Sequence, residues 1–217
     1  MLIQQAKLLR KEGYSLSEIA QSLHIAKSTA SVWCRNMILS QQSKALIVHK
    51  MDLGRQKSIE IKKLKKDVLI KSIEGIAAEK LSKICFDCNT YSLMAALLYW
   101  GEGAKLNTHH VTFINSDPLM IRTFLYVFRN AFSIKEEKFR IVLHLHEYHD
   151  EEKMKAYWSE ITNIPPLQFS KTYIKPHTGK TKREDYKGCI SIRYYDYKIA
   201  LAINTLYNKI PEKLGVW

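Results

Sequence analysis

A single carboxylate follows a helix-forming stretch near the middle of the chain. Residues 93–102 read Leu-Met-Ala-Ala-Leu-Leu-Tyr-Trp-Gly-Glu, and a second glycine, Gly103, comes next. The small and apolar residues predict a helix, and we expect the glycines to end it by adopting positive φ. Glu102 then lies at the helix C-terminus, where the helix dipole disfavours a negative charge. A carboxylate in this place usually has a partner, and a divalent cation is a natural one.

Two other groups of side chains are of types that bind metals. Cys85 and Cys88 form one C-x-x-C pair. Structural zinc needs four ligands, which His109 and His110 would have to complete. Cys34 and Cys189 have no local companion, so reduced thiols without a metal are the alternative interpretation. Redox chemistry is less favoured, because no thioredoxin-like β-α-β unit surrounds the pair.

The second group is a histidine cluster. His144 and His146 lie two residues apart on one predicted strand and therefore on the same face, and His149 follows in a turn. Together with Glu147 and Asp150 they have the donor types of a transition-metal site. Histidines with ordinary hydrogen bonds are the alternative interpretation.

After Glu102, segments with the hydrophobic periodicity of strands alternate with segments that have the periodicity of helices, which predicts an α+β domain. After the helix that carries Glu102 we expect strand, helix, strand, helix, strand, strand and helix. The predicted ranges are 110–115, 117–132, 139–146, 150–162, 168–175, 188–195 and 197–209.

The stretch 93–105 and the segment Val111-Thr-Phe-Ile-Asn-Ser-Asp-Pro-Leu-Met120 together resemble the LAGLIDADG homing-endonuclease family. The resemblance covers about residues 90–209. It implies that a small-residue helix packs against its twin and delivers an acidic residue to Mg²⁺ at the scissile phosphates. Glu102 matches the acidic position and Ala96 a small position. One copy of the motif implies a homodimer that pairs through the helix at 92–101.

The same resemblance implies a sheet that forms a saddle on DNA. Arg140, Lys171, Lys175 and Arg193 alternate outward along the predicted strands, which suits a DNA-binding face. In an active nuclease, Lys171 or Lys175 would stabilise the charge that develops on the phosphate. Leu97 and Trp100 would lie at the expected interface between the two paired helices, and their bulky side chains count against cleavage.

The first forty residues predict three short helices. Residues 2–11 form the first helix, with Ile3, Ala6, Leu8 and Leu9 expected on its buried side. Ser15-Leu-Ser-Glu18 is a capping box that begins a second helix. After a short turn at 24–26, a third helix is expected over 27–38.

The segment Ser17–Trp33 resembles the helix-turn-helix of resolvases and transposases. His24 stands where that class usually has a turn glycine, so we expect His24 to have positive φ. In such a motif the third helix enters the major groove, and exposed residues near its N-terminus read bases. Helical spacing places the following residues outward: Lys27, Ser28, Thr29, Val32 and Arg35.

The segment at 41–84 links the two regions and is strongly basic. Residues 41–83 contain eleven basic and five acidic side chains, and Leu64, Val68 and Ile73 recur at helical spacing. We expect helix here, with Gly54 as a candidate break between two helices. Three roles remain open: contact with phosphates, packing of the apolar stripe on a domain, and contact with a membrane.

Composition narrows the class of protein. The 217 residues carry a formal charge of +13 and have a pI near 9.5, which indicates a polyanionic partner, most often nucleic acid. No run approaches the roughly 20 apolar residues of a membrane span, and the first residues lack the apolar run of a signal peptide. Four cysteines are too few for a disulfide scaffold. We expect a cytoplasmic, nucleoid-associated protein.

Together these features predict three parts: a helix-turn-helix at 1–40, a basic helical linker at 41–84 and a LAGLIDADG-like domain at 85–217. The first hypothesis is a site-specific double-stranded DNA-binding protein, a regulator or homing-endonuclease relative, that acts as a homodimer. The alternative is an active Mg²⁺-dependent DNA endonuclease that uses Glu102. A third hypothesis is a metal-binding interaction module built on the cysteines and histidines.

Overall fold

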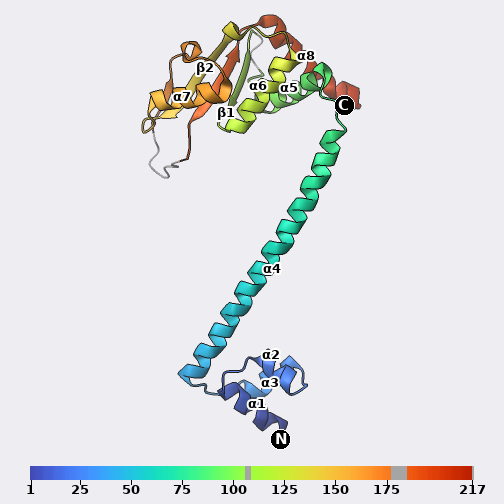
Figure 1. Cartoon of the computed structure of the whole chain (residues 1–217), viewed down its shortest axis with the longest axis vertical. Coiled ribbons are helices and arrows are strands. Elements are labelled where there is room, and N and C mark those ends of the chain that lie inside the picture. Colours follow the sequence, from blue (N-terminus) through green and yellow to red (C-terminus); the bar gives the residue numbers. More distant parts are fainter. Residues whose placement is uncertain (106–108, 177–184, 217) are drawn as a thin grey trace. The chain divides into compact units, whose positions relative to one another are not determined.

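The protein is described by a computed structural model that covers residues 1–105, 109–176 and 185–216. The chain divides into two compact units, residues 1–83 and 84–217. Figure 1 labels the helices and strands of both units. The protein belongs to the mixed α+β class, with a four-stranded sheet confined to the second unit.

Three short helices open the first unit: α1 (Leu2–Lys11), α2 (Leu16–Ser22) and α3 (Lys27–Cys34). They enclose a small core of Ala6, Ile19 and Ala30, each fully buried. The predicted capping box at the start of α2 is confirmed. The prediction for the turn is also confirmed, because His24 has a φ of 54°.

Two predictions for this unit are wrong. Ile3 and Leu8 are exposed on α1, so only one side of that helix contributes to the core. The third helix ends at Cys34 rather than at residue 38. Met37 still packs against the core, so the apolar spacing continued beyond the end of the helix.

A single helix of 42 residues, α4 (Gln41–Ser82), completes the first unit. Gly54 does not break it, because a solvated helix tolerates a glycine at a cost of about 1 kcal/mol relative to alanine. Its first turns contact the small helices: the Lys50 ammonium lies 3.0 Å from the Glu18 carboxylate. Every residue at 51–82 is exposed. Of the described helices, none combines the length and apolar character of a membrane span.

The second unit follows the predicted order of helices and strands. It contains a sheet in the order β1-β4-β2-β3, in which only β2 and β3 run parallel. Its elements are α5 (Cys88–Glu102), β1 (Val111–Asn115), α6 (Pro118–Ala131), a 3-10 turn (Glu136–Lys138), β2 (Phe139–His146), α7 (Glu151–Thr162), a second 3-10 turn (Pro166–Gln168), β3 (Tyr173–Lys175), β4 (Cys189–Tyr194) and α8 (Tyr197–Leu214).

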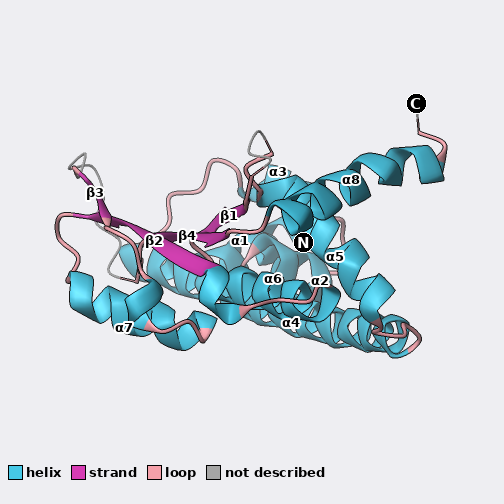
Figure 2. Ribbon diagram, turned by 90° about the horizontal axis from the view of Figure 1, so that it is seen from above, coloured by secondary structure: helices cyan, strands magenta, loops and turns pink. Residues whose placement is uncertain are grey.

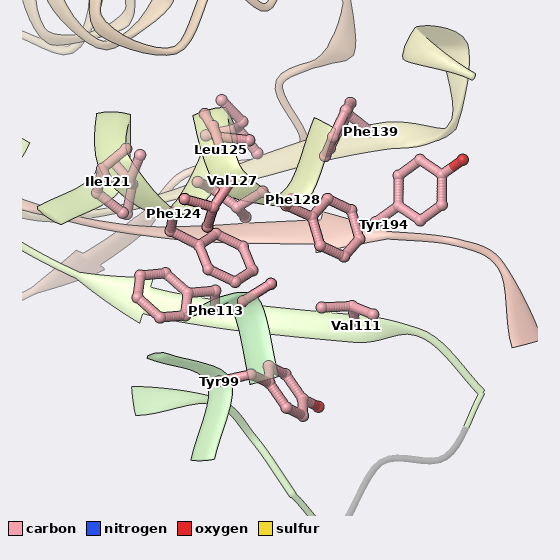
Figure 3. Packing of buried hydrophobic residues seen from close by; sticks show 14 of the residues in the cluster. Tyr99, Val111, Phe113, Ile121, Phe124, Leu125, Val127, Phe128, Phe139 and Tyr194 are labelled. Atoms are coloured by element: carbon pink, nitrogen blue, oxygen red, sulfur yellow. The ribbon is translucent and has the colours of Figure 1, made fainter. Parts of the chain in front are cut away.

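One face of the sheet is apolar and covered by helices. Alternate residues of β2, from Phe139 to Leu145, are buried, and α6 and α7 lie on one side of the sheet in Figure 2. Phe113 of β1 stacks on Phe124 of α6 with ring centroids 3.9 Å apart, at the centre of the packing shown in Figure 3. Strand alternation therefore turns the intervening side chains to the opposite face.

Some predicted bounds in this unit are wrong. Of the expected strand at 168–175, only Tyr173–Lys175 forms β3, because ladder pairing with β2 begins only at Tyr173, opposite His144. A 3-10 turn, Pro166–Gln168, occupies the first predicted position. The last helix continues through Pro211 to Leu214. The polar loop at 177–184 lies outside the described residues.

The Glu18 carboxylate gives the first unit a pH-dependent contribution to stability. A hydrogen bond from the Ser15 N–H, and then the Lys50 ammonium, lower the pKa of Glu18 below 4.5. A lowered carboxyl pKa stabilises the fold above pH 4.5, and this contribution is lost as the pH falls through the folded-state pKa. We expect Glu18→Gln to remove this component of acid sensitivity from thermal melts, whereas Glu12→Gln retains it. Parallel acid sensitivity in wild type and Glu18→Gln would contradict this.

Candidate functional site

Glu102 is the last residue of α5, and its side chain is exposed. Neither neighbouring glycine adopts the expected positive φ: Gly103 has φ −80° and ψ 154°. Gly103 is needed for space instead, because a Cβ atom there would lie 2.3 Å from Cδ2 of the Tyr99 ring. A Cβ at Gly101 would meet nothing within 4 Å.

The segment after Glu102 is fastened to strand β1. Gly103 forms a β-bridge with Phe113, and the N–H of Ala104 donates to the carbonyl of Thr112 at 2.9 Å. The buried Tyr99 hydroxyl donates to the Ala104 carbonyl at 3.1 Å. The carboxylate is therefore carried on a helix end that has a fixed place beside the sheet.

The residues that α5 buries and exposes differ from those expected from the sequence. Ala95 and Ala96 are fully buried in the core of their own unit, so Ala96 does not lie on an outer face. The exposed side carries the large residues Leu93, Leu97 and Trp100. The surface of α5 that is open to a partner is therefore bulky and apolar.

Two arginines stand directly opposite each other on the face of the sheet that points away from the apolar core. Arg140 of β2 pairs with Arg193 of β4, whose other neighbour is Thr112 of β1. Arg140 donates to the carbonyl of Glu137 at 2.7 Å and to that of Phe139 at 2.6 Å. Like charges directly opposite in a sheet are destabilising, and no described carboxylate forms an ion pair with either guanidinium. An anionic ligand would remove this repulsion.

Unused hydrogen-bonding groups lie on the same face. Within the described part of the chain, Arg193 Nε, Ser191 Oγ and His144 Nε2 are buried and lack a partner. Burial, followed by the charges of Lys175 and Arg193, lowers the pKa of His144 below 6.5. Neutral imidazole can donate or accept, and unpaired buried polar groups are costly. The polar atoms without a partner thus lie beneath the surface of this face, next to the two arginines.

Glu102 and Lys175 are carried at opposite edges of the sheet: the segment after Glu102 joins β1, and Lys175 belongs to β3. Cys189 of β4 lies between these edges and is paired across the strands with His144. Burial raises the pKa of the Cys189 thiol, while Lys175 lowers it and Glu102 raises it. Lys171 is exposed and precedes β3, so it does not occupy the strand position expected from the sequence.

One chain offers little to a metal ion. Among the described residues, no three His, Cys, Asp or Glu side chains gather in a way that could hold one. Mg²⁺ commonly uses one or two carboxylates together with waters and substrate phosphates. Glu102 therefore fits a Mg²⁺ site only if a second copy and a phosphate group complete the ligand set.

The cysteine and histidine groups have other contacts. Cys85 and Cys88 are exposed, and the Cys88 thiol donates to the carbonyl of Ala131 at 3.6 Å. His149 Nδ1 accepts from the N–H of His146 at 3.0 Å, which leaves Nε2–H to donate to the Tyr186 carbonyl at 2.9 Å. Both ring nitrogens of His149 are thus used by the backbone.

The predicted DNA-contacting residues of the first unit lie at or just beyond α3. Lys27, Ser28 and Val32 are exposed, and Thr29 is half-buried. Arg35 is exposed and directly follows the end of the helix. The side chains are thus accessible, but Arg35 lies beyond the helical residues.

Sequence reasoning did not identify Thr112, Ser191 and Cys189. These residues share with Arg140 and Arg193 the face of the sheet that points away from the apolar core, which we call the open face. Alternation along β4 contains the signal, because Cys189, Ser191 and Arg193 are separated by the buried Ile190 and Ile192. Threonine, serine and cysteine carry no charge, so their types alone do not indicate a ligand-binding face as arginines do. Their importance follows from the strand register, which places them beside the charged residues.

Comparison with known proteins gives no assignment: no family model, curated protein or solved structure matches the chain. The functional argument therefore depends on the residues and their geometry. The opposed arginines, the unused polar groups beside them and the exposed Glu102 are the features that a function must explain.

The crowding at Gly103 predicts an asymmetric effect of alanine at the two glycines. We expect Gly103→Ala to lower the free energy of unfolding by about 1–3 kcal/mol, because the methyl group must displace the buried Tyr99 ring. Gly101→Ala should be neutral or stabilising, because alanine is the better helix former. Urea unfolding of both variants measures the difference. Equal stabilities would show that Tyr99 does not fix the end of α5.

Proposed function

We propose that this protein is a site-specific double-stranded DNA-binding protein. In this proposal the first unit supplies a helix-turn-helix, and the second supplies a LAGLIDADG-like domain whose open sheet face lies on the duplex. The observation that carries the proposal is the opposed pair Arg140 and Arg193 on the face of the sheet that points away from the apolar core. Such a role places the protein at the nucleoid in the cytoplasm.

The open sheet face suits phosphate and base contacts together. Arginine binds phosphate through a planar fork of N–H donors, and phosphate would neutralise both Arg140 and Arg193. Arg140 is exposed on this face, and arginine can also bond base edges. The net charge of +13 would add attraction to any duplex.

The first unit supports sequence reading by α3. Helices α2 and α3 are joined by four residues in which His24 takes positive φ. This matches the short turn of a helix-turn-helix. Lys27 and Ser28 are exposed at the N-terminus of α3, the part of a recognition helix that reaches base edges.

A homodimer is part of this proposal, and the exposed side of α5 supports it. Leu93, Leu97 and Trp100 are spaced four and three residues apart and lie on one helix face. Pairing of this face between two copies would bury them and bring two Glu102 carboxylates to one duplex. It would also supply two helix-turn-helix units for a palindromic site. A single-chain mass in light scattering, with and without DNA, would remove this part of the proposal.

Binding selection on a randomised duplex library tests the proposed function. Wild type should enrich a defined sequence. Arg35→Ala should lose preference at one or two positions, by about 1–3 kcal/mol per base pair, if Arg35 contacts a base. Lys11→Ala, on α1, is the control and should enrich the wild-type sequence. No enrichment by wild type would contradict site-specific binding, and unchanged preference in Arg35→Ala would assign readout to other residues.

A second candidate function is Mg²⁺-dependent cleavage of DNA. It is favoured by Glu102, which is exposed at a fixed helix end beside β1. With two copies and a bound phosphate, Glu102 would hold Mg²⁺, which supplies activated water and charge stabilisation when bound. Lys175, on β3, is the lysine that would neutralise developing charge in this candidate function, whereas Lys171 lies outside the strand.

Cleavage of the selected duplex with Mg²⁺ tests the second candidate. Wild type should cut at a defined position, and Glu102→Gln should abolish cutting while binding is retained, because glutamine cannot replace the anionic ligand. Glu147→Gln provides the matched control, since Glu147 is exposed elsewhere in this unit. Selective binding without cutting by wild type would leave the protein a DNA-binding regulator rather than a nuclease.

A further inference from the structure

One side of helix α4 carries a concentrated positive charge. Successive residues of an α-helix are turned by about 100°. On that basis five cations between residues 55 and 66 fall within about 160° of the circumference. We call this surface the basic face of α4; its members are Arg55, Lys62, Lys63, Lys65 and Lys66.

Acidic residues are segregated from the basic face. Glu60 and Asp67 project from the opposite half of the helix, the half that also carries Leu64 and Val68. Between residues 55 and 66 the basic face therefore contains no carboxylate of its own. Five of the six cations between residues 55 and 66 thus share one side, and only Lys57 lies on the half that carries the acidic residues.

The positive charge on this face is not neutralised within the described chain. Lys62 and Lys66 are four residues apart, and like charges at this spacing destabilise a helix. No described carboxylate pairs with the four lysines, and Arg55 meets Asp52 only at 3.4 Å with both side chains exposed. An extended polyanion would relieve the repulsion.

We propose that the basic face of α4 binds the phosphate backbone of double-stranded DNA. This inference rests on the proposed DNA-binding function and adds a contact site outside the sheet and α3. The face extends over about 17 Å, at about 1.5 Å per residue. Phosphates of one strand follow at about 3.4 Å along the duplex axis, so the face has the length to contact several successive phosphates.

The distribution of side chains favours a duplex over an anionic membrane. A helix that lies on a membrane inserts its apolar side, and Trp or Tyr commonly marks the lipid interface. The half of α4 opposite the basic face carries Glu60 and Asp67, which anionic lipid would repel, and residues 41–82 contain no Trp, Tyr or Phe. Apolar residues are not confined to one side, because helical spacing places Ile59 within the basic face. The helix therefore lacks a continuous apolar side to insert, whereas the exposed cations of the basic face can meet phosphates without insertion.

Two matched double variants test the assignment in the full-length chain. Lys62→Gln with Lys66→Gln removes two charges from the basic face. Lys57→Gln with Lys71→Gln removes two charges from the opposite half of the same helix. Both pairs leave the same net charge, and glutamine has nearly the helix propensity of lysine. Fluorescence anisotropy over a range of salt concentrations, on the duplex selected by wild type and on a scrambled duplex, measures binding.

Counterion release sets the expected size of the effect. Each lost phosphate contact lowers the steepness of log K against log salt by about 0.9. The basic-face variant should therefore lose about 1.8 from the slope, with equal loss of affinity on the selected and scrambled duplexes. The opposite-half variant should keep the wild-type slope.

The other outcomes overturn the proposal in distinguishable ways. Equal slope losses in both variants would show that net charge, rather than the basic face, determines the salt dependence. Unchanged slopes in both would show that α4 does not contact DNA. Failure of wild type to bind either duplex would instead refute the proposed function on which this inference rests. Binding of wild type to phosphatidylserine vesicles, lost only in the basic-face variant and without effect on DNA, would assign the face to lipid.

Discussion

The uncompensated pair of arginines on adjacent strands is the constraint around which the functional surface is arranged. Strand alternation commits every second residue of β2 and β4 to the apolar core, so Arg140 and Arg193 have only the opposite face to occupy. Register then sets them side by side. A shift of one residue in either strand would bury an arginine, so the stability of the core also enforces the charge arrangement outside it. In the proposed function, phosphate groups of the duplex would neutralise both guanidinium groups.

Helix α5 links the core to that surface. Its alanines are buried against the unit's own elements, which lets the helix lie close to them, while Tyr99 packs against Gly103 and fixes where the helix ends. Glu102 therefore has a defined position although its side chain is solvated. In the proposed homodimer, the exposed apolar side of the same helix would pair the two copies. One element thereby combines packing, assembly and delivery of a carboxylate.

Much of the architecture could be predicted from the sequence because its signals are local. Capping residues and hydrophobic periodicity predicted the order of elements, and a non-glycine residue at a turn predicted the positive φ of His24. Other features depend on contacts that spacing does not reveal. Ala96 was expected on an outer face, but a small residue suits a close approach to either a partner or the helix's own core. Gly103 was expected for its conformational freedom, whereas the position of the Tyr99 ring makes it necessary for space. The polar atoms of Ser191 and His144 that lack a partner can be located only through the pairing of strands. Lys171 lies outside β3 because ladder pairing with β2 begins only at Tyr173.

The central claim is that the open face of the sheet binds DNA through the opposed arginines. The most direct test is the salt dependence of duplex binding by Arg140→Gln with Arg193→Gln, compared with Arg122→Gln with Lys153→Gln on the helices that cover the other face. Thermal melting of each variant confirms that it is folded. The account predicts weaker binding by the sheet variant and a loss of about 1.8 from the slope of log K against log salt, with no change in the helix-side control. Wild-type affinity and slope in the folded sheet variant would contradict it.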